Sequence, residues 1–362
     1  MLILANTWVV IVILILLINL TSFLFREKYK AVNYKPKVTV VIAIWNESPR
    51  IRKCVESILN SDYPKNKFNI LVTGGGEDNT VEVCKKLESE GKINFMPEYK
   101  RGGKWTALNK AIEKVETELI AFTDGDYVVD KSWLSELVKN SSGVDIVVGS
   151  IWTTTERTFS SKMYVVYHAF FDTLFSAVSR IFGSTRFMGQ NSLFKRHVFD
   201  KLLFKKSQIE DMRLGFEAYK MGFKVRQVYQ AKTYSAVPAS IRDFRVELVR
   251  VFEGIYNELL REGNMFAIAS FVFTILSFVL LPFTFYNLFK FDYMTWSLSL
   301  VAMVLFMINC ICIQLKFKRK MLKYAIYTVP FAVTLLLSSL EAMLRLLFKK
   351  NIGWPTLNKI VD

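Results

Sequence analysis

The sequence predicts an α/β protein in which a mostly parallel, Rossmann-like sheet forms a cytosolic domain between membrane-length helices. Three observations lead to this class. Strands and helices alternate from residue 37 to about 150, as they do in a parallel sheet with right-handed crossovers. The run Leu119–Thr123 is apolar enough for a strand buried on both faces. The two ends of the chain are rich in apolar residues, and 52% of the 362 residues are hydrophobic.

The formal net charge of +16 arises from 48 Lys and Arg against 32 Asp and Glu. An excess of this size suits nucleic acid, an anionic membrane surface or a phosphorylated substrate. The basic residues flank the membrane-length segments, which favours the last two partners and argues against a nucleic-acid enzyme. The 4 cysteines form no C-x-x-C pair and there are only 2 histidines, so we expect neither a zinc site nor a disulfide framework.

The first segment, residues 1–25, is predicted to be a transmembrane helix. From Leu2 to Phe25 it carries no charge, and it has the length of about 20 residues that a bilayer crossing needs. The basic residues that follow it are Arg26, Lys28, Lys30, Lys35 and Lys37. By the positive-inside rule the chain starts outside and continues in the cytoplasm. A secretory signal peptide would have a shorter apolar core and a basic start, so we expect an uncleaved anchor.

Residues 37–235 are predicted to form the cytosolic domain. Strands are expected where apolar and β-branched residues cluster, and helices where apolar residues recur on one face. The expected elements are a strand at 37–44, a turn at 45–49, a helix at 50–59, a strand at 68–72, a helix from 79 or 80 to about 90, strands at 93–96, 119–123, 145–151, 192–194 and 224–229, and helices at 105–115 and 210–221.

Two segments are expected to lie at the membrane surface. Residues 163–182 are strongly apolar and aromatic but carry His168, Asp172 and Arg180, so a helix at the interface is favoured over a span. Residues 240–260 form a basic amphipathic pattern, and residues 240–262 are therefore assigned to an interfacial amphipathic helix.

Residues 265–348 are predicted to hold about three transmembrane helices, at 266–289, 294–315 and 322–348. Together with the first segment they give four crossings and would leave the tail, residues 349–362, outside. The lysines of that tail favour the inside. Pro330 and Glu341 also leave open a re-entrant or broken last segment. The crossing count and the tail charge therefore conflict.

The turn Asp124-Gly125-Asp126 follows the central strand directly. Ligands bind at the carboxyl ends of strands in open α/β sheets, so this turn is placed where a site is expected. Two carboxylates one residue apart can hold a hard divalent cation, and such a cation can neutralise a diphosphate. The alternative is an ordinary surface turn, since D-G-D is common in loops.

Five motifs occur in one order along the chain. They are V-V-I-A-I-W-N-E at 40–47, I-L-V-T-G-G-G-E-D-N-T at 70–80, G-G-K-W-T-A-L-N at 102–109, D-G-D at 124–126 and I-E-D-M-R-L-G-F-E-A-Y-K-M-G-F-K-V at 209–225. This order resembles the family-2 glycosyltransferases of the GT-A fold, over about residues 37–260. The membrane segments on both sides resemble the membrane-integrated members, namely hyaluronan and cellulose synthase relatives, ceramide glucosyltransferases and polyprenyl-phosphate glycosyltransferases.

The resemblance implies a donor site at the ends of the first two strands. Ala43, Trp45 and Glu47 would contact the nucleotide base and ribose, although Ala43 and Trp45 replace the Pro and Tyr of the usual P-x-Y-N-E. Thr73 and Gly74 stand where relatives carry Asp residues, as in V-D-D-G-S. These two positions therefore supply no carboxylate to the base, but the glycine backbone could approach the ligand closely. A plain glycine-rich turn is the alternative.

The resemblance also assigns the diphosphate and the metal. Lys104 matches the family's G-K-x-x-A-L-N motif and would meet the diphosphate; the alternative is a solvated cap residue. Asp126 would be the more direct ligand of Mn²⁺ or Mg²⁺, and Asp124 would reach the metal or the nucleotide ribose.

On the acceptor side, Glu210 and Asp211 match the family's E-D motif, and Asp211 would be the general base. A helix dipole also favours carboxylates at that position, which is a sufficient structural explanation. Gln190 and Glu210 are placed in the acceptor region. Arg250 aligns with the Arg of Q-x-x-R-W and would meet the diphosphate, although Glu247 and Val251 replace the Gln and Trp. The alternative is a basic helix on anionic lipid.

These assignments imply a multi-pass cell-membrane enzyme with a cytoplasmic catalytic domain. It would transfer a sugar, with inversion and metal dependence, from a nucleotide diphosphate sugar, expected to be a UDP-sugar, to a lipid or polyprenyl acceptor. Its role would lie in polysaccharide or glycolipid synthesis. The alternatives are a processive polysaccharide synthase that extends and exports a polymer, and a catalytically inactive membrane scaffold. The altered Thr73-Gly74 edge and the changed Q-x-x-R-W region motivate the second alternative.

Overall fold

The computed structural model describes residues 2–24, 35–100, 102–182, 189–260, 262–263, 265–318, 320–348 and 359–360. The chain divides into two compact units. The first, here the membrane unit, comprises Met1–Arg26, Glu156–Phe182 and Pro238–Ile360. The second, here the sheet unit, comprises Glu27–Thr155, Gly183–Val237 and Val361–Asp362.

One mixed sheet dominates the sheet unit. Among the described residues its eight strands are β1 (Val38–Trp45), β2 (Phe68–Gly75), β3 (Asn94–Pro97), β4 (Leu119–Asp124), β5 (Tyr127–Val129), β6 (Ile146–Thr153), β7 (Asn191–Lys195) and β8 (Val225–Ser235), in the order β3-β2-β1-β4-β7-β6-β8-β5. The pairs within β3-β2-β1-β4 are parallel, β7 is antiparallel to both its neighbours, and β6 and β8 are again parallel. The predicted α/β class with a mostly parallel sheet is confirmed.

The sheet has to curl back on itself because of the D-G-D turn. Asp124 ends β4 and Tyr127 begins β5, so only Gly125 and Asp126 connect the two strands. In the sheet, however, β7, β6 and β8 lie between β4 and β5. A flat sheet would separate β4 from β5 by about four strand spacings, roughly 19 Å, which two residues cannot bridge. The sheet therefore curls so that β5 returns to the carboxyl end of β4 at the D-G-D turn.

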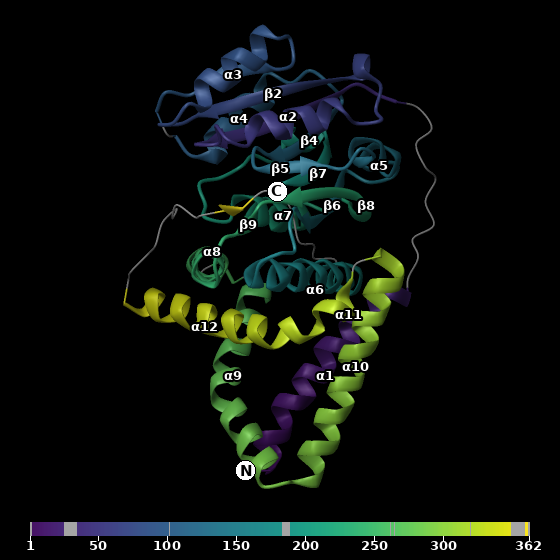
Figure 1. Ribbon diagram of the computed structural model, residues 1–362, viewed down its shortest axis with the longest axis vertical. Coiled ribbons are helices and arrows are strands. Elements are labelled where there is room, and N and C mark those ends of the chain that lie inside the picture. The colour runs from purple at the N-terminus through teal and green to yellow at the C-terminus, as the bar shows by residue number, and fades with distance from the viewer. Residues whose placement is uncertain are drawn as a thin grey trace. The chain divides into compact units, whose positions relative to one another are not determined.

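Helices cover both faces of this sheet, and α2, α3 and α4 can be found beside its strands in Figure 1. They are α2 (Ile51–Leu59), α3 (Thr80–Ser89), α4 (Lys104–Glu113), α5 (Trp133–Lys139) and α7 (Glu210–Lys220), with short 3₁₀ turns at Lys65–Lys67 and Arg196–Asp200. One core lies under α2, α3 and α5, and the other under α4 and α7. Val40 and Ile42 of β1 face the first core and Val41 faces the second, so β1 is buried on both faces, as its continuous apolar run predicts.

The membrane unit is helical. Its elements are α1 (Leu2–Leu24), α6 (Phe159–Phe182), α8 (Ile241–Gly254), a π-helical turn (Ile255–Leu259), α9 (Met265–Phe289), α10 (Tyr293–Phe317), α11 (Met321–Tyr324), a 3₁₀ turn (Ala325–Tyr327) and α12 (Thr328–Leu347). The short strands β9 (Val237–Pro238) and β10 (Lys359–Ile360) complete the described elements. Within the described ranges, four segments are long and apolar enough to cross a membrane: Asn6–Phe23, Ala267–Phe289, Tyr293–Phe317 and Met321–Leu347.

Within this unit the helices run in two directions. α1, α9 and α10 lie alongside one another, whereas α6 and α12 run across them (Figure 1). Polar contacts join α1 and α10 at both ends. At one end the Thr295 hydroxyl donates a hydrogen bond to Asn6 Oδ1 (2.9 Å). At the other end Lys316 Nζ donates a hydrogen bond to the Ser22 carbonyl (2.9 Å). Near that second end, Asn19 Nδ2 of α1 donates to the Phe170 carbonyl of α6 (3.4 Å).

The expected strands are all present, and the sequence analysis missed β5 and α5 of the sheet unit, the short strands β9 and β10, and the 3₁₀ turns. The helix expected at 240–260 is α8, and it changes to π-helical hydrogen bonding at Ile255. The segment expected at 322–348 is broken by the 3₁₀ turn at Ala325–Tyr327. A broken last segment was one of the two possibilities that the sequence left open. The predicted tail lies outside the described residues except for Lys359–Ile360.

Candidate active site

Three predicted donor-site residues lie side by side on neighbouring strands. Ala43 of β1 is in register with Thr73 of β2 and with Asp124 of β4. Ala43 is 8% exposed and Thr73 is 1% exposed. Trp45 is half-buried at the end of β1. The motif residues from the first, second and fourth strands therefore share one edge, as the parallel register requires.

The glycines after β2 are required by the close approach of backbone segments. Gly74 has φ +122°, and a Cβ there would lie 2.0 Å from the Ile44 carbonyl oxygen. A Cβ on Gly75 would lie 2.1 Å from the Glu98 carbonyl oxygen. The Glu98 N–H donates to the Gly74 carbonyl (2.8 Å), which holds the segment after β3 against this loop. Packing thus explains both glycines, and their approach to a ligand stays a prediction.

Asp78 is a residue of this edge that the sequence analysis did not single out. Its carboxylate accepts hydrogen bonds from the Ser48 N–H (3.2 Å), the Thr80 N–H (3.0 Å) and the Thr80 hydroxyl. Partial burial opposes ionisation, but the hydrogen bonds from Thr80 and Ser48 outweigh it and lower the pKa of Asp78. Asp78 therefore ties the loop after β1 to the start of α3. The sequence signal was D-N-T before a helix, a pattern that favours local side-chain hydrogen bonds.

The loop after β1 is held from both sides. Asn46 adopts φ +60°, and its Oδ1 accepts from the Glu77 N–H (2.7 Å). The Glu47 N–H donates to the Thr80 hydroxyl (2.8 Å), and the Glu47 carboxylate forms an ion pair with Arg50 at 2.7 Å. Asn tolerates this left-handed conformation better than most residues do. The predicted donor-site residue Glu47 is therefore fixed in place by the loop around it.

Lys104 joins the two halves of the predicted site. It begins α4, and its Nζ lies 2.7 Å from Asp124 Oδ1 and 3.6 Å from Glu210 Oε1. Burial alone would lower the pKa of Lys104, but the charges of Asp124, Glu210 and Asp211 outweigh it and raise the pKa well above its usual value. Burial raises the pKa of Asp124, and the charges of Asp126 and Asp211 add to that rise against the opposing effect of Lys104. The ammonium group is thus surrounded by carboxylates from β4 and α7.

Asp126 faces a different side of the turn. It is 7% exposed and lines a cavity of about 230 Å³ together with Pro49, Arg50, Lys53, Tyr127 and Val128. A Cβ on Gly125 would lie 2.6 Å from Ile44 Cγ2 and 3.4 Å from Glu47 Cγ, so glycine lets the turn pack directly on the loop after β1. The small cavity opens this carboxylate to ions and ligands between α2 and β5.

The acceptor-side residues gather at the start of α7. Asp211 Oδ1 accepts from the Met212 N–H (2.8 Å), and Glu210 is 4% exposed. A Cβ on Gly189 would lie 2.8 Å from Asp211 Cβ, so Asp211 packs against the Gly189-Gln190 turn that precedes β7. The structure therefore brings Gln190, Glu210, Asp211, Lys104 and Asp124 into one neighbourhood, while Arg250, half-buried on α8, belongs to the membrane unit.

The carboxylates can be tested for their fit to a divalent cation. Asp124 and Asp126 supply hard oxygen ligands, the kind that Mg²⁺ and Mn²⁺ prefer. Within the described ranges, no group of three His, Cys, Asp or Glu side chains converges in a way that could hold an ion. The two carboxylates are of the chemical kind that a divalent cation binds, and among the described residues they do not form a closed metal site.

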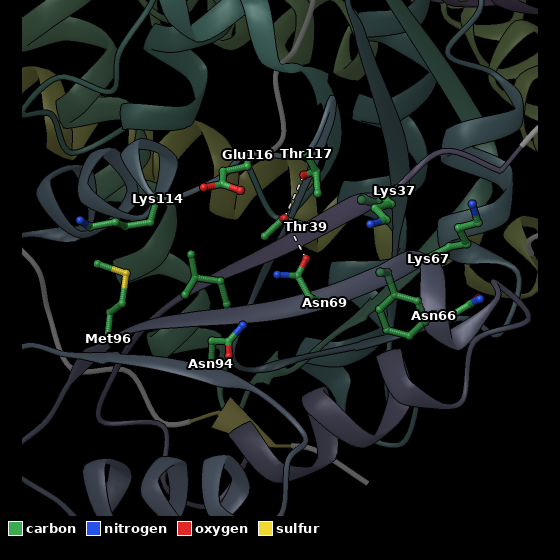
Figure 2. Close-up of a pocket in the computed structure, with 13 residues that line it drawn as sticks. Lys37, Thr39, Asn66, Lys67, Asn69, Asn94, Met96, Lys114, Glu116 and Thr117 are labelled. Carbon is green, nitrogen blue, oxygen red and sulfur yellow. Dashed lines mark hydrogen bonds between the residues drawn. The ribbon is translucent and has the colours of Figure 1, made fainter.

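A larger cavity of about 570 Å³ lies at the opposite edge of the sheet (Figure 2). Its lining comes mainly from the starts of β1, β2 and β3 and from the end of α4, with Lys37, Lys67 and Lys114 among the side chains. Thr39 lies between Asn69 and Thr117 and is hydrogen-bonded to both, at 2.8 and 2.9 Å. Lys37 directly precedes β1 and Trp45 ends it, so the two residues lie about 25 Å apart along the extended strand, and this cavity is separate from the D-G-D turn.

Comparison with known proteins bears on this arrangement. Residues 39–203 match the family described as "Glycosyl transferase family 2". Over 120 residues the chain is 32% identical to glycosyltransferase AglE of Haloferax volcanii, covering 32% of this chain and 40% of that protein. It is 24% identical over 257 residues to the poly-beta-1,6-N-acetyl-D-glucosamine synthase of Staphylococcus aureus, covering 66% of this chain and 61% of that protein. The chain spans less than two thirds of the length of either relative.

A solved structure resembles the whole chain. A mannosyltransferase from Pyrobaculum calidifontis, in complex with GDP-Man and Mn²⁺, superposes with a TM-score of 0.65 at 18% identity, covering 96% of this chain and 99% of that one. At this identity the superposition shows the fold alone. Residues 39–203 are thus similar to glycosyl transferase family 2 domains, and the chain has the GT-A fold.

Proposed function

We propose that this protein is a membrane-bound glycosyltransferase that moves a sugar from a nucleotide diphosphate sugar to a lipid-linked acceptor, with inversion at the anomeric carbon. The observation that carries the proposal is the position of Lys104, between Asp124 at the end of β4 and Glu210 beside Asp211 at the start of α7. This contact joins the predicted donor side to the predicted acceptor side. The mannosyltransferase that shares the fold holds GDP-Man and Mn²⁺, which supports a nucleotide sugar and a divalent cation here.

The donor side follows from the strand edge. The nucleotide would lie over Ala43, Trp45 and Thr73, with Glu47 near the ribose. Lys104 would shift from Asp124 toward the diphosphate when the donor binds, so that a fixed positive charge faces the leaving group. A divalent cation held by Asp126 and Asp124 would neutralise the diphosphate. Arg250 is proposed as a further diphosphate contact on the strength of the family resemblance.

The acceptor side requires a base unless the acceptor is already anionic. For a hydroxyl acceptor, Asp211 would take the proton as the oxygen attacks the anomeric carbon from the face opposite the leaving group. The Gly189-Gln190 turn and Glu210 would position that acceptor. For a lipid phosphate, which is already anionic, Asp211 would only orient the attacking oxygen.

The membrane arrangement is proposed from the direction of α12. Phe331 of α12 is buried between Tyr167 of α6 and Phe244 of α8, with ring centroids at 6.0 and 6.3 Å. Within the helix, Glu341 forms an ion pair with Arg345 at 2.7 Å, and Arg245 of α8 also contacts Glu341. Charged residues are costly in the hydrocarbon core and ordinary at its surface.

The exposed face of α12 supports the same placement. An apolar stripe faces away from the protein at Val329, Val333, Leu337, Leu344 and Leu347. An amphipathic helix with such a stripe can lie in the plane of the interface. The segment Met321–Leu347, which includes α12, has the length and composition of a span, but the direction of α12 across α1, α9 and α10 favours the interface (Figure 1). Three crossings would then put the tail on the cytoplasmic side, which agrees with its lysines.

The function is tested with the purified full-length protein, a panel of UDP- and GDP-sugars, Mn²⁺ or Mg²⁺, and mass spectrometry of lipid extracts. Asp211→Asn should abolish transfer and keep donor binding, and Asp126→Ala should abolish transfer and metal-dependent donor binding. Asp200→Asn is the matched control, because its carboxylate is 66% exposed. Full activity in either site variant would refute that assignment.

Two alternatives have their own outcomes. The similarity to a poly-beta-1,6-N-acetyl-D-glucosamine synthase favours a processive enzyme as the second candidate, and long products instead of single transfers would establish it. No turnover of any nucleotide sugar in the presence of metal would indicate an inactive scaffold. For the membrane arrangement, C-terminal fusions to green fluorescent protein and to alkaline phosphatase report the side of the tail. A fluorescent fusion supports three crossings, and an active phosphatase contradicts them.

A further inference from the structure

Six side chains form a mixed aromatic and polar surface on the strands next to the D-G-D turn. Trp152 of β6 is in register with Tyr234 of β8, which is in register with Val128 of β5. Two residues earlier on the same face, Ser150 of β6 pairs with Lys232 of β8. Asp130 lies beside this pair, because its backbone N–H donates a hydrogen bond to the Lys232 carbonyl (2.9 Å). Directly paired residues in a sheet share a face, so these six residues, here the aromatic patch, form one surface.

The patch holds its rings and polar groups in fixed positions. The Trp152 and Tyr234 rings lie 6.5 Å apart at an angle of 56°, and Lys232 Nζ lies 4.6 Å from the centre of the Trp152 ring. Trp152 Nε1 donates to the Ser150 hydroxyl (3.0 Å), and the Tyr234 hydroxyl donates to Asp130 Oδ2 (3.3 Å). Apart from Ser150, these residues are half-buried and so partly open to solvent. Neither aromatic ring belongs to the two hydrophobic cores of the sheet.

The charges of the patch balance. Burial opposes ionisation of Asp130, but hydrogen bonds from Ser132 and the charge of Lys232 outweigh it and lower the pKa of Asp130. The patch therefore carries one ammonium and one carboxylate and has no net charge. A phosphate or nucleic acid would gain little from such a surface. A neutral sugar suits it, because a pyranose ring presents C–H groups to aromatic faces and hydroxyls to polar groups.

The patch is continuous with the candidate active site. Val128 lines the cavity that contains Asp126, and it is also the cross-strand neighbour of Tyr234. β6 runs in the same direction as β4, since both are antiparallel to β7. Trp152, near the end of β6, therefore lies toward the same edge as Asp124. From Val128 to Trp152 the patch spans two strand spacings, about 10 Å, which is enough for more than one sugar unit.

We propose that the aromatic patch binds neutral sugar units of a glycan acceptor next to Asp126. The inference rests on the proposed function and extends it, because it gives the acceptor a saccharide portion as well as a lipid. Trp152 and Tyr234 would stack on the sugar rings, and Asp130 and Lys232 would hydrogen-bond to their hydroxyls. The residues act on binding and orientation, and none of them takes part in bond making.

The test uses the full-length protein with chitohexaose, cellohexaose and mannohexaose as probes, followed by ligand-observed NMR and calorimetry. At least one hexasaccharide should bind, and Trp152→Ala should weaken that binding by about tenfold or more. Trp152→Phe, which keeps a ring, should recover most of the affinity and guards against a folding defect. Tyr219→Ala is the matched control, because Tyr219 is an exposed aromatic (43%) on α7, outside the patch.

The outcomes separate the two proposals. If no hexasaccharide binds at millimolar concentration, or if Trp152→Ala binds as well as the wild type, the patch is not a sugar site. If binding depends on Trp152 while no nucleotide sugar is turned over, the patch stands and the proposed transfer fails. Nucleotide affinity measured in parallel should be the same in the wild type, Trp152→Ala and Tyr219→Ala. A loss of nucleotide affinity in Trp152→Ala would overturn the assignment to the acceptor.

Discussion

Asn191 offers a sharp test of how the sheet supports the site. Its amide is fully buried at the start of β7. Nδ2 donates to the carbonyls of Ser150 and Ala231, each at 2.9 Å, and Oδ1 accepts from the indole N–H of Trp133 at 2.7 Å. One side chain thus joins α5, β6 and β8 at the irregular pairing between Val148 and Ser150.

The cost of Asn191→Ala can be worked from these contacts. Trp133 is 0% exposed, so its indole N–H would lose its partner in a buried site. An unsatisfied buried donor costs about 1–3 kcal/mol, and each further lost hydrogen bond about 1 kcal/mol. Allowing for partial relaxation, we expect a loss of about 3 kcal/mol in the free energy of unfolding, or about 6–12 °C in melting temperature for a unit of this size.

Thermal unfolding of the detergent-solubilised protein, followed by size-exclusion fluorescence, measures this loss. Asn69→Ala is the control, since Asn69 is exposed on β2 and accepts one hydrogen bond, from Thr39 (2.8 Å), so its loss should cost about 0.5 kcal/mol. Below the melting temperature, Asn191→Ala should also reduce turnover more than donor affinity, because Gly189 and Gln190 directly precede it and Asp211 packs on Gly189. Equal melting shifts in the two variants would refute this reasoning.

Three further predictions concern the donor side. Gly74→Ala should destabilise the protein by about 1–3 kcal/mol and weaken nucleotide binding, because the new Cβ would collide with the Ile44 carbonyl. Gly91→Ala is the control and should keep full nucleotide affinity, because Gly91 also has a positive φ (+69°) but a Cβ there would meet open space. Lys104→Met should lower donor affinity by about 10- to 100-fold, and Lys104→Arg should have an intermediate effect. In a double-mutant cycle with Asp124→Asn, the two substitutions should not be additive, because Lys104 and Asp124 form an ion pair. Additive effects would argue against this ion pair. Chelation of divalent cations should abolish turnover, with recovery on adding Mn²⁺, and undiminished turnover in chelator would contradict a role for the metal.

The sequence indicated the sheet well where residues within one strand determine the outcome. β1 and β4 are continuous apolar runs, and such runs are buried on both faces in a parallel sheet. The placement of Ala43, Thr73 and Asp124 on one edge followed from the alternation of strands and helices. The contact of Lys104 with Asp124 could be anticipated only from the family resemblance, since no spacing rule relates residues 20 positions apart.

The features that were missed depend on distant partners. β5 has three residues, and it is a strand because it pairs with Thr233–Ser235 of β8, more than 100 residues later. A three-residue run carries no periodicity of its own, so its sequence alone cannot identify it. The direction of α12 depends likewise on Phe331 packing against α6 and α8, although its composition is that of a span. Asp78 was overlooked because one of its partners, Ser48, lies 30 residues earlier in the loop after β1, although the other, Thr80, begins α3 next to it.

The path of the chain between β6 and β7 has a consequence for how activity is measured. β6 ends at Thr153 and the chain leaves the sheet unit after Thr155, forms α6 in the membrane unit, and returns to begin β7 at Asn191. The same detour therefore starts beside Trp152 and ends beside Gln190. We therefore expect a rearrangement of α6 in response to lipid to act on both points through the covalent chain. Bilayer thickness and headgroup composition thus become experimental variables in their own right, and turnover in detergent need not equal turnover in a native-like membrane.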